Sequence, residues 1–302
     1  MGLLLGLLLA AAPAAGGPLD RPEGPFKAEV VETRGLSDRI ESEVRFPSPL
    51  RGPFEANNTV WARLSVPRRP GPVPCILVLP IMAAPNVWIE ERFTRRFLSD
   101  GFAVLLLEMP YQFHRRPKPL VPSGRVFLAR TAKHLALNFR QSVLDARRAL
   151  DWLSSRPDID SSRIGLFGVS LGAMVGASLY CVDDRPKYAV FLLAGADFPG
   201  LAASSSMSRG FVSRAGITEE ALRAAWKGLD PLDYRKGNAG KNALLVNVRS
   251  DSVVPAANAL KLKEAFPRSR QVWLPFGHYS ALLHLLWIPR MISREFLANL
   301  GG

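Results

Sequence analysis

The stretch RIGLFGVSLGAMVG, residues 163–176, decides the fold of this 302-residue chain. Its apolar first half predicts a buried β-strand, and a helix is expected directly after Ser170. Between them lies Gly168-x-Ser170-x-Gly172, a sharp turn that holds the serine in a strained backbone conformation. Glycine at 168 and 172 omits the Cβ atoms that would clash in this turn. The following helix directs free N–H groups and its positive dipole end toward the serine, which favours negative charge there.

Apolar runs on both sides of this stretch predict further buried strands that alternate with helices. Residues 40–46 and 58–66 alternate apolar and polar side chains, which is typical of antiparallel strands at a sheet edge. This order predicts an α/β fold with a mostly parallel sheet, helices on both faces and antiparallel strands at the N-terminal edge. Buried strands are expected at 75–79, 102–107, 164–168, 188–194, 242–248 and 271–274, and helices at 88–98, 127–153, 171–179, 219–226, 256–266 and about 279–300, the last with a break or kink at Pro289.

The chain divides into parts of different composition. Residues 1–16 form an apolar run followed by small residues, which is typical of a secretory signal peptide and predicts an exported, periplasmic or extracellular protein. No Lys or Arg precedes this run, so an uncleaved anchor is the alternative. Residues 17–38 are expected to form an extended arm, and residues 39–302 the main domain. Within that domain, residues 198–240 interrupt the alternation and are candidates for a small cap, with an ordinary crossover as the alternative.

An aspartate and a histidine each follow a later strand of the expected sheet. Asp251 comes after the strand at 242–248, and His278 comes after the strand at 271–274. Because the carboxyl ends of parallel strands meet at one edge, both side chains are expected near Ser170. His278 can take the serine proton, and Asp251 can orient the imidazole. The sequence therefore predicts a catalytic site of Ser170, Asp251 and His278.

Two features of this site have alternatives. Asp197 also follows a strand and is the rival acid, but Asp251 is preferred because Asp251-x-x-Val254-Pro255 leads straight into the next helix. An oxyanion needs two backbone donors. One is the N–H of Leu171, and the other is expected from Ile81 or Met82, in the loop after the strand at 75–79.

These motifs resemble those of the α/β-hydrolase superfamily, and most of all single-domain esterases of the dienelactone-hydrolase and acetyl-esterase kind. The resemblance covers the chain from about residue 40 onward, and this chain departs from it at Pro80-Ile81, where many members have His-Gly, and at Ala173, where many have another glycine. It rests on Asp160-x-x-Arg163-Ile164-Gly165-Leu166-Phe167-Gly168-Val169-Ser170-Leu171-Gly172, Asp251-x-x-Val254-Pro255 and Gly277-His278.

The resemblance implies hydrolysis of carboxylic esters through an acyl-enzyme, without a cofactor. The expected partner is a small-molecule or polymer-borne ester. A peptidase or amidase of the same fold is the alternative within enzymes, and a non-catalytic binding module on the same scaffold is the alternative outside them. The resemblance does not identify the substrate, because this fold supports many chemistries.

The charged residues, histidines and cysteines indicate which partners and metals to expect. The net charge of +13 makes an anionic surface a candidate partner, but no basic–aromatic pattern of a nucleic-acid-binding surface is present. Arg115 and Arg116 are candidates for holding a substrate carboxylate or phosphate, with solvated loop charges as the alternative. The histidines and cysteines lack metal-ligand spacing, so no metal is expected. Cys75 and Cys181 are expected to be separate buried thiols.

Overall fold

The computed structural model describes residues 17–301 apart from 21–23, 118–121, 129–130 and 281–283. The expected signal peptide, residues 1–16, lies outside the described residues. Among the residues described, no helix is long and apolar enough to cross a membrane.

The described chain forms one nine-stranded sheet with the strand order β1-β2-β3-β5-β4-β6-β7-β8-β9. Strands β5, β4, β6, β7, β8 and β9 pair in parallel, whereas β1, β2 and β3 are antiparallel at the N-terminal edge, as predicted. The strands are β1 (Glu29–Gly35), β2 (Arg39–Pro47), β3 (Thr59–Pro67), β4 (Val73–Leu79), β5 (Ala103–Leu107), β6 (Ile159–Val169), β7 (Pro186–Leu192), β8 (Ala243–Val248) and β9 (Arg270–Leu274).

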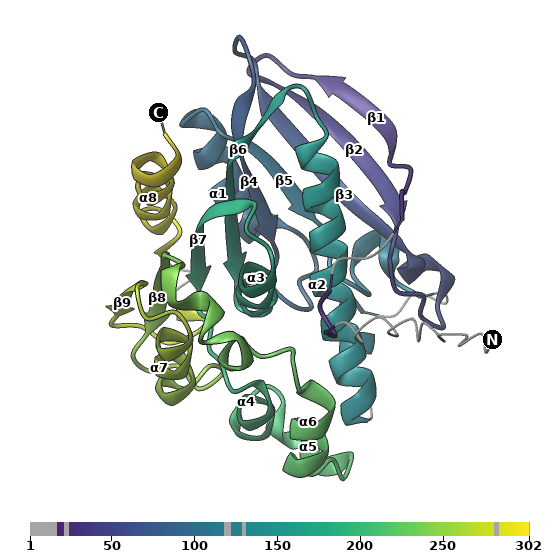
Figure 1. Cartoon of the computed structure of the whole chain (residues 1–302), viewed down its shortest axis with the longest axis vertical. Coiled ribbons are helices and arrows are strands. Elements are labelled where there is room, and N and C mark those ends of the chain that lie inside the picture. Colours follow the sequence, from purple (N-terminus) through teal and green to yellow (C-terminus); the bar gives the residue numbers. More distant parts are fainter. Residues whose placement is uncertain (1–16, 21–23, 118–121, 129–130, 281–283, 302) are drawn as a thin grey trace, which may run out of the picture.

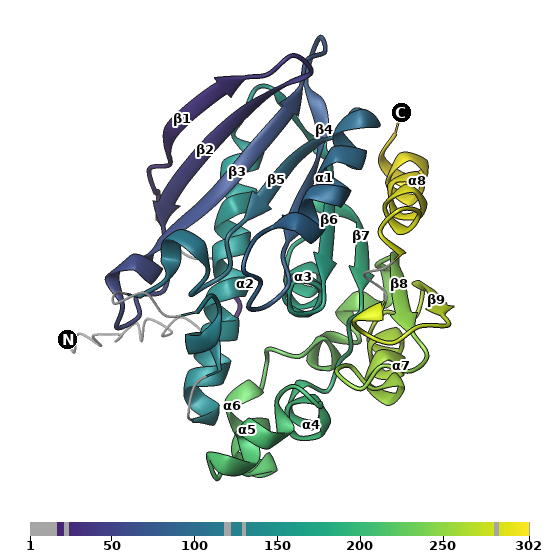
Figure 2. The same ribbon diagram turned by 180° about the vertical axis from the view of Figure 1, so that it is seen from behind.

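Helices cover both faces of this sheet (Figures 1 and 2). Leu77 and Leu79 of β4 belong to the core shared with α2, α3 and α7, whereas Ile76 and Val78 belong to the core shared with α1 and α8. This two-residue alternation explains why the central strands are apolar throughout. The helices are α1 (Trp88–Ser99), α2 (Ala132–Ser154), α3 (Leu171–Val182), α4 (Phe198–Ser204), α5 (Arg209–Arg214), α6 (Glu219–Trp226), α7 (Ala256–Ala265) and α8 (Ile288–Leu300).

The N-terminal arm differs from the expectation for residues 17–38. Residues 29–35 form β1, which pairs antiparallel with β2, so this part of the arm belongs to the sheet. Leu19 is buried in the core beside α2, and Arg140 donates from Nε to the Pro18 carbonyl at 2.6 Å. The arm is therefore docked on the domain at both of these points.

Two helices begin later than predicted. Helix α2 begins at Ala132, where the Thr131 side chain caps it by accepting a hydrogen bond from the His134 N–H. Helix α8 begins at Ile288, and Pro289 lies in its first turn. Proline at that position fits a helix start because its missing N–H would have no partner there, so Pro289 begins the helix and does not kink it.

Residues 198–240 leave the sheet after β7 and include α4, α5 and α6. These helices lie beyond the carboxyl ends of the parallel strands, beside the N-terminal end of α2 (Figures 1 and 2). Leu135 of α2 packs with Val212 and Leu222 in a small apolar cluster, and Trp226 packs against Phe139 at 4.9 Å between ring centroids. The segment therefore covers the edge of the sheet at which the strands before the predicted catalytic residues end.

Both cysteines are free thiols. Cys75 lies in β4 and Cys181 lies near the end of α3. Burial raises the pKa of the Cys75 thiol above its usual range and that of the Cys181 thiol to about 12. Both side chains are therefore protonated at neutral pH.

Candidate active site

Ser170 lies at the bend between β6 and α3 with φ 51° and ψ −116°. Its N–H donates to the Leu192 carbonyl at 2.8 Å, which fixes the bend against β7. A Cβ on Gly168 would lie 2.4 Å from the Gly172 carbonyl oxygen, and one on Gly172 would lie 2.1 Å from the Leu79 carbonyl oxygen. Both contacts are with backbone atoms that cannot move aside alone, so the turn requires glycine at both positions.

The structure brings Ser170, His278 and Asp251 together. Ser170 Oγ lies 3.2 Å from His278 Nε2, and His278 Nδ1 lies 2.8 Å from Asp251 Oδ2. The other carboxylate oxygen of Asp251 accepts the N–H groups of Val253 at 2.8 Å and Val254 at 2.7 Å. These bonds hold the carboxylate still behind the imidazole. With the Nδ1 proton shared with Asp251, Nε2 is free to accept the serine proton.

Asp197, the rival acid, has different partners. It caps α4 by accepting from the Gly200 N–H at 3.3 Å, and it pairs with Lys261 Nζ at 2.5 Å and with Arg223 at 3.3 Å. Burial raises the pKa of this carboxyl, but the hydrogen bonds from Lys261 and Gly200 outweigh burial and hold the pKa below its usual value. The carboxylate that reaches His278 is therefore Asp251.

The two candidates for the second oxyanion donor differ in availability. The Ile81 N–H donates to Glu90 Oε1 at 2.9 Å, so it is already engaged, and the expectation that it faces an oxyanion is wrong. Met82 and Leu171 both line the same cavity as Ser170. Within the residues described, the N–H groups of Met82 and Leu171 have no hydrogen-bond partner. These two donors remain for an oxyanion beside Ser170.

An apolar cavity of about 180 Å³ opens beside Ser170. It lies between α2, the three helices of residues 198–240 and the loops that carry Met82, Val253 and His278. Its described lining contains no charged side chain, and its polar side chains are Ser170, Ser205, Ser208, His278 and Tyr279. The apolar lining consists of Ile81, Met82, Phe127, Leu128, Leu135, Phe139, Val169, Leu171, Met174, Leu193, Phe198, Leu201, Ala202, Met207, Phe211, Val212, Trp226, Val253 and Val254.

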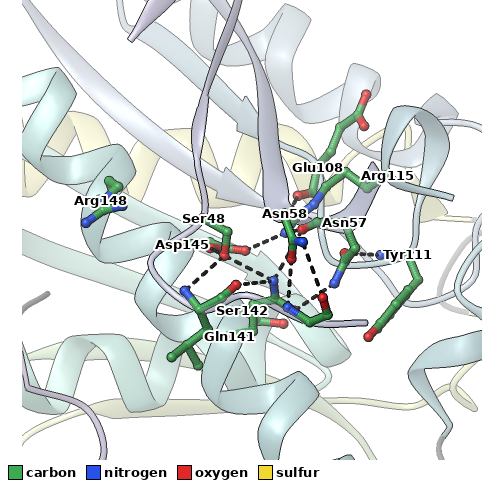
Figure 3. A network of polar contacts seen from close by, with 12 residues as sticks. Ser48, Asn57, Asn58, Glu108, Tyr111, Arg115, Gln141, Ser142, Asp145 and Arg148 are labelled. Atoms are coloured by element: carbon green, nitrogen blue, oxygen red, sulfur yellow. Dashed lines mark hydrogen bonds and ion pairs between the residues drawn. The ribbon is translucent and has the colours of Figure 1, made fainter. Parts of the chain in front are cut away.

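Arg115 lies elsewhere, which corrects its prediction as a substrate-binding residue. Its side chain is fully buried, and Nη2 lies 2.7 Å from Asp145 Oδ2. Its guanidinium also donates to the carbonyls of Asn57 and Glu108, each at 2.9 Å (Figure 3). Arg116 is half-buried, donates from Nε to the Phe113 carbonyl at 3.2 Å and does not line the cavity. Neither arginine faces Ser170.

Glu90 and Gln112 contact the loop after β4 and are not among the residues predicted from the sequence. Glu90 accepts the Ile81 N–H, and Gln112 donates from Nε2 to the Ile81 carbonyl at 2.7 Å. Both side chains are buried, at 0% and 1% exposure. The sequence does carry a signal for Glu90. Its spacing from Phe93 and Phe97 places it on the apolar, inward face of α1, where a solvated glutamate is not expected. Gln112 follows β5 in a loop, and no spacing marks it.

Comparison with known proteins identifies the fold. No family model matches the sequence. An acetyl xylan esterase from Paenibacillus sp. R4 superimposes with a TM-score of 0.71 over 92% of this chain and 90% of its own, at 18% identity. The chain has the α/β-hydrolase fold. Acetyl xylan esterase 1 from Thermoanaerobacterium sp. JW/SL YS485 shares this α/β-hydrolase architecture with a TM-score of 0.67 and 15% identity, over 90% and 89% of the two chains.

A curated relative points to the same fold. The α/β-hydrolase domain-containing protein WAV2 of Arabidopsis thaliana is 28% identical over 152 residues, which are 47% of this chain and 47% of WAV2. The alignable part thus spans about half of that relative. In the part of the chain that the structure describes, no group of three or more His, Cys, Asp or Glu side chains is placed to hold a metal ion.

Proposed function

We propose that this chain is a serine hydrolase that cleaves carboxylic esters. The observation that carries the proposal is the hydrogen-bonded series from Ser170 Oγ through His278 to Asp251, with distances of 3.2 and 2.8 Å. A serine hydroxyl needs a base to become a nucleophile, and a buried carboxylate behind the imidazole stabilises the cation that forms. The structural similarity to acetyl xylan esterases agrees with this chemistry.

The reaction follows from the geometry. Ser170 Oγ attacks the ester carbonyl carbon while its proton moves to His278 Nε2, and the carbonyl oxygen becomes an oxyanion. The N–H groups of Met82 and Leu171 stabilise that charge. The C–O bond to the alcohol then breaks, and His278 returns the proton to the leaving oxygen. Water, deprotonated by His278, then attacks the acyl carbon. The bond between that carbon and Ser170 Oγ breaks, His278 returns the proton to Oγ, and the carboxylic acid leaves.

The cavity beside Ser170 favours uncharged esters with an apolar acyl chain. An anionic or cationic group in this lining would lose its hydration without gaining a charged partner. Each buried methylene contributes about 0.8 kcal/mol, which corresponds to about a fourfold gain in kcat/KM. We therefore expect activity to rise from acetyl toward medium-chain esters until the chain fills the cavity.

Labelling with a fluorophosphonate tests the nucleophile. We expect the wild type to be labelled and Ser170→Ala to remain unlabelled. An unlabelled wild type would support the non-catalytic binding module, and undiminished labelling of Ser170→Ala would remove this serine as nucleophile. A series of p-nitrophenyl esters, compared with aminoacyl anilides, tests the bond cleaved. A clear preference for anilides would establish the peptidase or amidase alternative.

A further inference from the structure

We propose that Gln112 and Glu90 are positioning residues that hold the Ile81–Met82 peptide so that the Met82 N–H faces Ser170. The proposal rests on the proposed function, because an oxyanion forms beside Ser170 only if the serine attacks a carbonyl. The two residues come from two separate elements, the loop after β5 and helix α1, and act on the reaction only through the backbone that they hold.

Gln112 sets the direction of the peptide. Its Nε2 donates to the Ile81 carbonyl at 2.7 Å. A trans peptide is planar, so its carbonyl and the N–H of the next residue point in opposite directions. Holding the Ile81 carbonyl toward Gln112 therefore turns the Met82 N–H away from Gln112. Ile81, Met82 and Ser170 line one cavity, and this is the side on which an oxyanion would form.

Glu90 fixes the preceding peptide. Its Oε1 accepts the Ile81 N–H at 2.9 Å, and its side chain is fully buried on α1. Both backbone polar groups of Ile81 thus have side-chain partners. A Cβ on Gly172 would lie 2.5 Å from the Pro80 carbonyl oxygen, so α3 packs closely against the same loop. The loop is held on several sides, which is the preorganisation that oxyanion stabilisation requires.

The direction in which burial shifts the pKa of Glu90 agrees with this role. Burial raises the pKa of its carboxyl, with the Ile81 N–H lowering it in part and the nearby Glu91 raising it further. A shift in this direction disfavours negative charge behind a loop that must stabilise an oxyanion. Oε1 accepts the Ile81 N–H.

The test compares substitutions that remove a contact with substitutions that keep it. Gln112→Met retains the size of the side chain but removes the donor, and kcat is expected to fall at least tenfold with KM within about twofold, since losing an oxyanion donor costs about 10²- to 10³-fold. Glu90→Leu is expected to lower kcat similarly. Glu90→Gln keeps the acceptor oxygen and is expected to retain wild-type kcat.

Thr94→Val is the matched control. Thr94 is also buried on α1, and its Oγ1 has no partner among the described residues, so this substitution is expected to leave kcat unchanged. Circular dichroism and thermal midpoints establish that each variant folds. If Gln112→Met does not fold, the comparison of Glu90→Leu with Glu90→Gln tests the positioning role. All variants are assayed in the full chain with one p-nitrophenyl ester and with the fluorophosphonate.

Two results would overturn the positioning role while leaving the proposed function intact. One is a labelled wild type whose folded Gln112→Met and Glu90→Leu variants keep kcat within twofold. The other is a rise in KM with unchanged kcat, which would indicate a substrate contact. A wild type that the fluorophosphonate does not label would overturn the proposed function, and the positioning role with it.

Discussion

His278 Nδ1 lies 2.8 Å from Asp251 Oδ2, and the other oxygen of that carboxylate is held by two backbone N–H groups. Asp251→Asn replaces this acceptor with an amide that can donate to Nδ1 and so favour the wrong tautomer of the imidazole. We expect kcat to fall about 10³- to 10⁴-fold with the fold intact. Steady-state kinetics and circular dichroism measure the two effects.

Asp197→Asn is the control for this assignment. Because Asp197 pairs with Lys261 and Arg223 and does not contact His278, kcat is expected to stay within about twofold while the free energy of unfolding falls modestly. A silent Asp251→Asn together with an inactive Asp197→Asn would transfer the acid role to Asp197.

Gly172→Ala tests the close approach of α3 to the loop after β4. The new Cβ would lie 2.1 Å from the Leu79 carbonyl oxygen, so the backbone must shift, at a cost of about 1–3 kcal/mol in the free energy of unfolding. Gly176→Ala, one turn later, would place its Cβ 3.2 Å from the Phe191 ring and at ordinary contact distance from the Leu79 and Leu166 side chains, with no backbone atom among these contacts, and is expected to be near neutral. Equal destabilisation of the two variants in urea would contradict the steric argument.

Ala202→Phe tests the cavity as an acyl site. Ala202 lies on α4 and lines the cavity, so a phenyl ring there would fill space that a long acyl chain needs. We expect kcat/KM for octanoyl esters to fall at least tenfold and that for acetyl esters to stay within about twofold. Ala224→Phe, at an exposed position of α6, should alter neither value. Uniform loss across the ester series would argue against an acyl site.

Arg115→Met tests the structural role of this arginine. The substitution leaves the Asp145 carboxylate buried without its cation, although Ser48 still donates to it at 2.6 Å. We expect a loss of about 3–5 kcal/mol in the free energy of unfolding, measured with urea. Arg116→Met is expected to cost less than about 1 kcal/mol. A stable Arg115→Met variant with a raised KM would instead return Arg115 to substrate binding.

Much of this fold could be predicted because its parallel strands are buried on both faces and form continuous apolar runs. Strands β4 and β8 differ from their predicted ranges by two residues or fewer. Strand β1 could not be found this way, because all its residues are exposed and show no alternation. Its pairing with β2 depends on backbone hydrogen bonds, which side-chain patterns do not record.

The residues of the site also differ in how far the sequence predicts them. Ser170, Asp251 and His278 could be predicted because each follows a strand, and strand ends meet at one edge of a parallel sheet. Gln112 and Arg115 could not, because both lie in the connection after β5, Arg115 in a short 3-10 helix, and only the tertiary structure shows where their side chains point. Arg115 turns into the interior toward Asp145, and Gln112 turns to the Ile81 carbonyl.

The stability of the chain is expected to depend on pH through Glu90. Burial raises the pKa of this carboxyl in the folded chain, whereas an unfolded glutamate titrates near about 4.3. Above that pH the unfolded chain releases the proton that the folded chain retains, so the Glu90 contribution to the free energy of unfolding declines until pH passes the raised pKa. Glu90→Gln cannot ionise and does not lose this contribution. Its stability relative to wild type should therefore increase as pH rises from 4 to 8 in urea titrations, whereas the difference between Thr94→Val and wild type should stay constant. A Glu90→Gln difference that is flat or declines with pH would show that Glu90 is ionised in the folded chain.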